Sequence, residues 1–83
     1  MKTLEYFPQG VCSSLFKITY DNNKIIKIDI IGGCNGNLKG ISSLLENMPI
    51  IEAINKLEGI KCGMKGTSCP DQISKALKKC LNN

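Results

Sequence analysis

The chain of 83 residues contains no histidine and no tryptophan, and all eleven of its basic residues are lysines. Without histidine there is no Ser-His or Cys-His couple and no imidazole general base, so the sequence argues against classical hydrolytic catalysis. Without arginine the chain lacks the side chain that recognises phosphates and bases in a bidentate manner. We interpret the net charge of +4 as a solvated lysine surface, and nucleic-acid binding is not favoured.

Long apolar runs are missing as well. No run approaches the roughly 20 residues that a membrane-spanning helix requires. The N-terminal stretch MKTLEYFPQG carries Lys2, Glu5 and Pro8 and lacks the apolar segment that is typical of a signal peptide. We therefore predict a cytoplasmic protein without membrane contact. In that compartment the five cysteines are expected to be metal ligands, redox thiols or core residues rather than structural disulfides.

The first third of the chain has the alternation of apolar and polar residues that predicts strands. Residues 3–7 form a short predicted strand. Two longer alternating segments flank the sequence DNN at 21–23, whose residues favour a tight turn, and together they predict a β-hairpin. The predicted apolar faces are Phe16, Ile18 and Tyr20 on the first hairpin strand and Ile26, Ile28 and Ile30 on the second.

Three segments with helical spacing of apolar residues follow the hairpin. The first has Asn37 as its predicted N-cap and Leu38, Ile41, Leu44, Leu45 and Met48 on one face. The second has Ile50, Ile51, Ile54 and Leu57 inward and is closed by Gly59. The third begins at Pro70 and has the stripe Ile73, Ala76, Leu77, Cys80 and Leu81. Strands followed by helices predict a single α+β domain over residues 1–83, in which the hairpin and the N-terminal strand form an antiparallel sheet and the helices pack on one face.

The five cysteines divide into two kinds. Cys80 lies within the apolar stripe of the last helix and is predicted to be a core residue. The other four lie in loops or at element ends, mostly beside glycine: Cys12, Cys34, Cys62 and Cys69. Four thiolates are the number that a closed tetrahedral zinc site requires. The spacing C-x21-C-x27-C-x6-C lacks two close pairs. The spacing alone therefore leaves open a metal site, small thiols in tight turns, and a redox pair of Cys62 and Cys69.

The sequence GGCNGN at 32–37 lies between a predicted strand and a predicted helix, a place where phosphates are often bound. It matches neither the dinucleotide-binding nor the Walker pattern. We take Gly33, Asn35, Gly36 and Asn37 as candidate residues for binding a nucleotide or another anion. A tight turn without a ligand is the alternative.

The sequence TSCPDQ at 67–72 resembles the name-giving motif of the TSCPD domain family. Three further stretches resemble the family in the same order: GVCS at 10–13, GGCNGNLKGI at 32–41 and GIKCG at 59–63. The resemblance covers nearly the whole chain. The motif cysteines of the family correspond here to Cys12, Cys34, Cys62 and Cys69. Versions of this domain are found at the C-terminal end of some ribonucleotide reductases, notably cobalamin-dependent ones.

The resemblance implies an accessory role in deoxyribonucleotide and DNA synthesis. A chain of 83 residues has no room for the catalytic barrel, radical source and substrate pocket of a reductase. We expect a zinc-binding module without an organic cofactor that docks to a ribonucleotide reductase catalytic chain, a nucleotide or nucleic acid. The alternative is a thiol redox partner that relays electrons through Cys62 and Cys69. A homodimer formed through exposed sheet edges is a further expectation.

Overall fold

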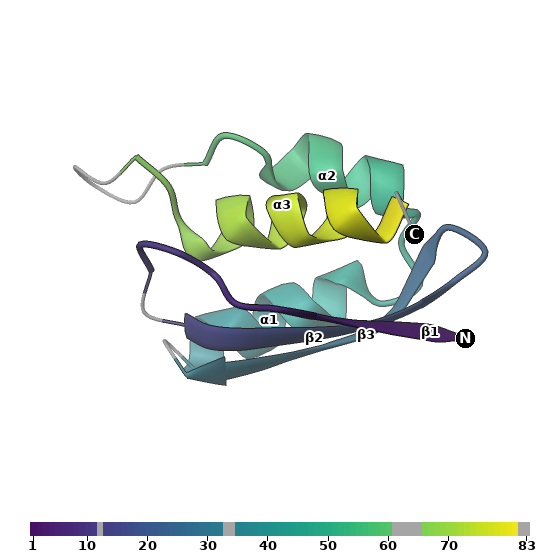
Figure 1. Cartoon of the computed structure of the whole chain (residues 1–83), viewed down its shortest axis with the longest axis horizontal. Helices are drawn as coiled ribbons and strands as arrows, with labels where there is room; N and C mark the ends of the chain where they lie inside the picture. The colour runs from purple at the N-terminus through teal and green to yellow at the C-terminus, as the bar shows by residue number, and fades with distance from the viewer. Residues whose placement is uncertain (12, 33–34, 61–65, 82–83) are drawn as a thin grey trace.

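The computed structural model describes residues 1–11, 13–32, 35–60 and 66–81. Three strands come first: β1 (Lys2–Tyr6), β2 (Ser13–Asp21) and β3 (Lys24–Gly32). Three helices follow: α1 (Asn35–Leu45), α2 (Ile50–Leu57) and α3 (Cys69–Leu81). This order, drawn in Figure 1, confirms the predicted α+β class with a sheet followed by helices.

The strands form one antiparallel sheet in the order β1-β2-β3. The predicted hairpin is confirmed, and its turn is formed by Asn22 and Asn23 with φ angles of 50° and 64°. Asparagine tolerates this left-handed conformation, and two such residues give the turn that matches the twist of paired strands. β1 then adds to β2 with Leu4 opposite Ile18.

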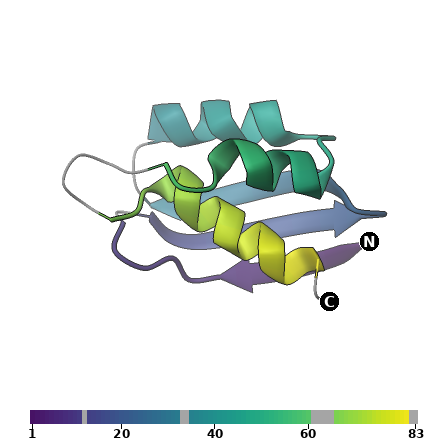
Figure 2. The same ribbon diagram turned by 90° about the horizontal axis from the view of Figure 1, so that it is seen from above.

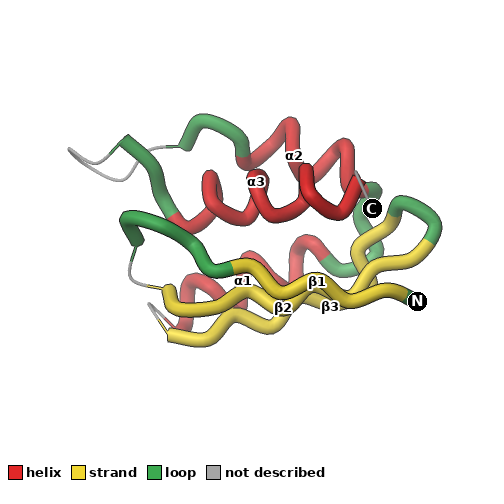
Figure 3. Tube along the Cα trace, in the orientation of Figure 1, coloured by secondary structure: helices red, strands yellow, loops and turns green. Residues whose placement is uncertain are grey.

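The helices cover one face of this sheet, as predicted (Figures 2 and 3). α3 packs across β2 and β1, α2 packs against α3, and α1 runs along β3. The core lies between these layers. Its largest fully buried apolar side chains are Phe16, Ile18, Ile25, Ile50, Ile73 and Leu77. Burying the aromatic ring and five aliphatic chains stabilises the fold by about 1.5–3 kcal/mol for each side chain.

The apolar face of β3 differs from the prediction. Ile28 is buried and Ile30 is half-buried, but Ile25 takes the buried position that was predicted for Ile26. The pairing register shifts between Thr19 and Tyr20, which leaves Ile26 as an extra, half-buried residue. Such a bulge interrupts the alternation of side chains along a strand. The prediction for Ile26 is therefore wrong because it assumed a regular strand.

The segment between α1 and α2 also departs from the sequence pattern. α1 begins at Asn35 rather than after an Asn37 cap, and it ends at Leu45, so Met48 lies outside it. Asn47, with a φ of 65°, turns the chain back toward the hairpin. There its N–H donates to the Ile25 carbonyl at 2.6 Å, and the Ile25 N–H donates to the Met48 carbonyl at 2.9 Å. Asn47 and Met48 therefore form backbone hydrogen bonds with β3 instead of the last helical turn that the sequence predicted.

Two residues predicted to face the core are instead exposed. Leu44 is 76% exposed and Ile51 is 55% exposed. A helix that packs on only one side buries a single apolar stripe. Leu44 and Ile51 lie outside the buried stripes of their helices and are therefore exposed to solvent. The predicted end of the second helix is confirmed. α2 ends at Leu57, Glu58 is its C-cap residue, and Gly59 follows with a φ of 85°.

Candidate functional site

The motif TSCPDQ forms the start of α3. The Ser68 hydroxyl accepts the Asp71 N–H at 3.2 Å, and the Ser68 carbonyl accepts the Gln72 N–H at 2.9 Å. Ser68 is therefore the N-cap residue, and the helix begins at Cys69, one residue before the predicted start at Pro70. This position directs free N–H groups and the positive end of the helix dipole toward the surroundings of Cys69.

Asp71 ties the end of α2 to the start of α3. Its side chain is only 9% exposed. Oδ1 accepts the Gly59 N–H at 2.8 Å, and Oδ2 accepts the hydroxyl of Thr67. The Lys75 ammonium lies 3.9 Å from Oδ2, one helical turn further along. A buried carboxylate is stable only when it is hydrogen-bonded and paired in this way.

Ser68 makes a second link to the same segment. Its hydroxyl donates to the Ile60 carbonyl at 2.6 Å. Gly59 and Ile60, which directly precede residues 61–65, are thus both bound to the first turn of α3. Cys62 itself lies outside the described residues.

Gln72 makes the corresponding link to β1. Its Oε1 accepts the Tyr6 hydroxyl at 3.3 Å and the Gln9 N–H at 3.0 Å. Its Nε2 donates to the Thr67 hydroxyl at 3.0 Å. The buried amide therefore holds the segment after β1, three residues before Cys12, against the start of α3.

Cys69 contacts the start of β2. Its sulfur lies 3.0 Å from the Ser13 hydroxyl, and Ser13 is paired with Gly32 at the end of β3. Cys12 and Cys34 lie outside the described residues, so the predicted convergence of the four cysteines stays a prediction. Among residues 1–11, 13–32, 35–60 and 66–81, no group of three or more cysteine, aspartate or glutamate side chains could hold a metal ion.

The hydrogen bonds that hold the start of α3 to the segments after α2 and β1 come from side chains of the motif TSCPDQ at 67–72. A family model described as the TSCPD domain matches residues 1–81. The chain belongs to the TSCPD domain family. Comparisons with curated proteins and with solved structures returned no match. Within the described part of this TSCPD domain, every helix is too short or too polar to cross a membrane.

The candidate anion-binding residues lie at the beginning of α1. Asn35, Gly36 and Asn37 form the first turn of this helix, whereas Gly33 lies outside the described residues. A helix N-terminus favours an anion through its free N–H groups. Anion binding at this turn stays a prediction.

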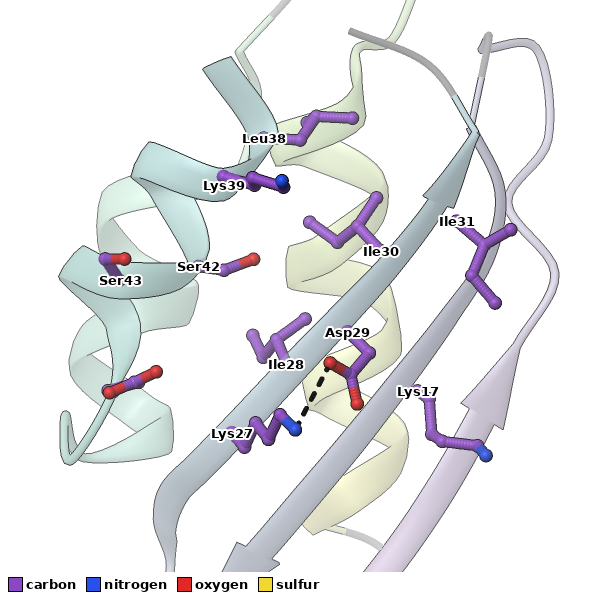
Figure 4. Close-up of a pocket in the computed structure, with 11 residues that line it drawn as sticks. Lys17, Lys27, Ile28, Asp29, Ile30, Ile31, Leu38, Lys39, Ser42 and Ser43 are labelled. Carbon is purple, nitrogen blue, oxygen red and sulfur yellow. Dashed lines mark ion pairs between the residues drawn. The ribbon is translucent and has the colours of Figure 1, made fainter. Parts of the chain in front are cut away.

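A groove that the sequence pattern did not predict lies between α1 and β3 (Figure 4). Its volume is about 600 Å³. Ile28, Ile30 and Leu38 supply apolar surface, and the ion pair of Lys27 with Asp29, at 3.6 Å, lies on its strand side. The polar residues Lys39 and Ser42 in α1, and Glu46 directly after its end, line the groove at helical spacing, and this spacing was the signal for the groove in the sequence.

Cys80 is buried in the core of the TSCPD domain, as predicted. Burial raises the pKa of its thiol to about 11 from an ordinary value near 9, and a backbone hydrogen bond partly offsets this rise. The folded state therefore disfavours the thiolate. Its contribution to stability is complete below pH 9 and is lost as the pH rises toward 11.

The substitution Cys80→Ala tests this assignment. Between pH 9 and 11 the natural chain is expected to lose up to about 3 kcal/mol of unfolding free energy that the variant does not lose, at about 1.4 kcal/mol for each pKa unit. Urea titrations of both proteins across this pH range would measure the difference. Parallel pH profiles would contradict the raised pKa.

Proposed function

We propose that this TSCPD domain is a metal-stabilised binding module in which Cys12, Cys34, Cys62 and Cys69 hold one zinc ion. The observation that carries the proposal is the set of contacts around the start of α3. Described residues within two positions of each of the other three cysteines are held directly, or through one neighbour, to Ser68 or Cys69. The proposal thus rests on the contacts of residues close to the cysteines in the chain.

The chain distances make this argument quantitative. Cys12 directly precedes Ser13, which contacts Cys69. Cys34 comes two residues after Gly32, and Cys62 comes two residues after Ile60. Since consecutive Cα atoms are about 3.8 Å apart, each of these cysteines is at most two chain steps from a residue in the contact set. Contacts between described residues thus bridge the 21, 27 and six intervening residues of the sequence, one or two positions away from each of these cysteines.

The donor set suits zinc. Thiolates are soft ligands, and four of them complete a closed tetrahedral site. A bound ion would supply a cross-link among the loops at one end of the sheet. A closed site leaves no coordination position for substrate, so we assign the domain a binding role rather than a catalytic one.

For the partner, we propose a ribonucleotide reductase catalytic chain or the nucleotide that such a chain binds. Family membership supports this proposal, because related domains are found at the C-terminal end of some reductases. The net charge of +4 would favour an acidic surface or a phosphate group. The domain would then act in deoxyribonucleotide synthesis as an accessory module.

The second candidate function is thiol redox transfer, which the position of Cys69 at the start of a helix favours. In this case the Cys69 thiolate would attack a disulfide of a partner protein and form a mixed disulfide. Cys62 would then displace the partner. Two electrons would pass to the partner disulfide, which becomes a dithiol, and a Cys62–Cys69 disulfide would remain.

Elemental analysis of protein purified without oxygen separates the two functions. The binding module is expected to carry one zinc per chain. Because loss of the metal is expected to unfold the chain, chelation should make the four motif thiols reactive together with the buried thiol of Cys80. Peptide mapping of the alkylated chain would identify the four motif cysteines among them. Absence of metal together with free reaction of these four thiols would contradict the zinc proposal. Absence of metal together with a Cys62–Cys69 disulfide would support the redox function instead.

A further inference from the structure

The position of Ser13 depends on an irregularity in β2. The buried apolar side chains of this strand are Phe16, Ile18 and Tyr20, which face the helices. In a regular strand Ser13 would share the opposite, open face with Lys17. The register shifts between Ser13 and Leu15, and Ser13 is only 5% exposed. The bulge therefore turns the Ser13 side chain toward α3, as bulges commonly re-aim a side chain next to a site.

Ser13 also joins the segments that carry the candidate ligands. It follows Cys12 in the chain, is paired with Gly32 shortly before Cys34, and lies 3.0 Å from the sulfur of Cys69. In the protonated pair either group can donate this hydrogen bond. A metal-bound thiolate has no proton, so the hydroxyl must then be the donor.

We propose that the Ser13 hydroxyl donates a hydrogen bond to the Cys69 thiolate and positions it as a metal ligand. This inference rests on the proposed four-cysteine site. Hydrogen bonds from neighbouring groups orient metal ligands, and removing one typically costs 10–100-fold in metal affinity. The hydroxyl also compensates the sulfur charge on a side of the site that is shielded from water. Ser13 is a positioning residue and not a ligand.

The test uses four variants of the full chain. Ser13→Ala removes the hydroxyl, whereas Ser13→Thr and Ser13→Val differ from one another only in having or lacking it. Ser14→Ala is the matched control, because Ser14 is the exposed neighbour. Zinc affinity is measured by competition with a chelator. The absorption of the cobalt-substituted protein reports the sulfur-to-metal charge transfer.

We expect Ser13→Ala and Ser13→Val to bind zinc 10–100-fold more weakly than the natural chain. Their cobalt charge-transfer band should move to longer wavelength, because a sulfur without the hydrogen bond is a stronger electron donor. Ser13→Thr should stay close to the natural chain in both measurements, and Ser14→Ala should be unchanged. The Thr and Val comparison keeps the test valid if Ser13→Ala does not fold.

Two outcomes would overturn the inference, and they are distinguishable. If the natural chain binds zinc and the Val and Thr variants match it in affinity and spectrum, Ser13 has no positioning role although the zinc site stands. If the natural chain binds neither zinc nor cobalt, the proposed function itself fails and the inference fails with it.

Discussion

Removal of the proposed zinc ion with a strong chelator is expected to unfold this domain. An 83-residue protein has a stability of about 4–12 kcal/mol. Structural zinc contributes about 10–16 kcal/mol in small zinc-binding peptides, which is as large as or larger than that total. The far-ultraviolet circular dichroism of α1, α2 and α3 should therefore fall after chelation and return when zinc is added back.

The cysteines provide matched controls for this experiment. Cys69→Ser removes a proposed ligand and should reproduce the chelated state without any chelator. Cys80→Ala removes a core thiol and should retain one zinc per chain, at a cost of about 1 kcal/mol in stability. A metal-free chain that keeps its helical signal and unfolds cooperatively would show that the sheet and helices are stable alone.

Replacing Asp71 with alanine is expected to destabilise the domain by about 2–4 kcal/mol. The carboxylate accepts hydrogen bonds from the Gly59 N–H and the Thr67 hydroxyl, and bonds to a charged group contribute about 1.5–3 kcal/mol. Alanine would remove both acceptors and leave their donors without these partners. Urea unfolding of the natural and variant proteins would measure the loss.

Asp29→Ala is the control for charge removal, because Asp29 forms an exposed ion pair with Lys27. Such a pair contributes at most about 1 kcal/mol. Asp71→Asn keeps an oxygen that can accept the Gly59 N–H and should fall between Asp71→Ala and the natural chain. Equal unfolding midpoints for Asp71→Ala and Asp29→Ala would contradict the role assigned to this network.

The element order of the fold could be predicted because each signal is local. Alternation around Asn22 and Asn23 predicted the hairpin, and periodic apolar residues with Gly59 at the end of α2 predicted the helices. The same local signals failed at Ile26 and Leu44. A bulge depends on the partner strand, and the width of a helix's buried stripe depends on the layer beneath it.

The candidate site divides in the same way. The sequence by itself singled out Cys12, Cys34, Cys62 and Cys69, and it predicted that Cys69 lies at the start of a helix. Both predictions were possible because glycine turns and helix caps depend on residues that are adjacent in the sequence. Only the tertiary structure showed that Asp71 holds the segment after α2, and Gln72 the segment after β1, against the start of α3. It also showed that a bulge turns Ser13 toward Cys69. These contacts join residues 12 to 63 positions apart, and such distances are decided by how the layers pack.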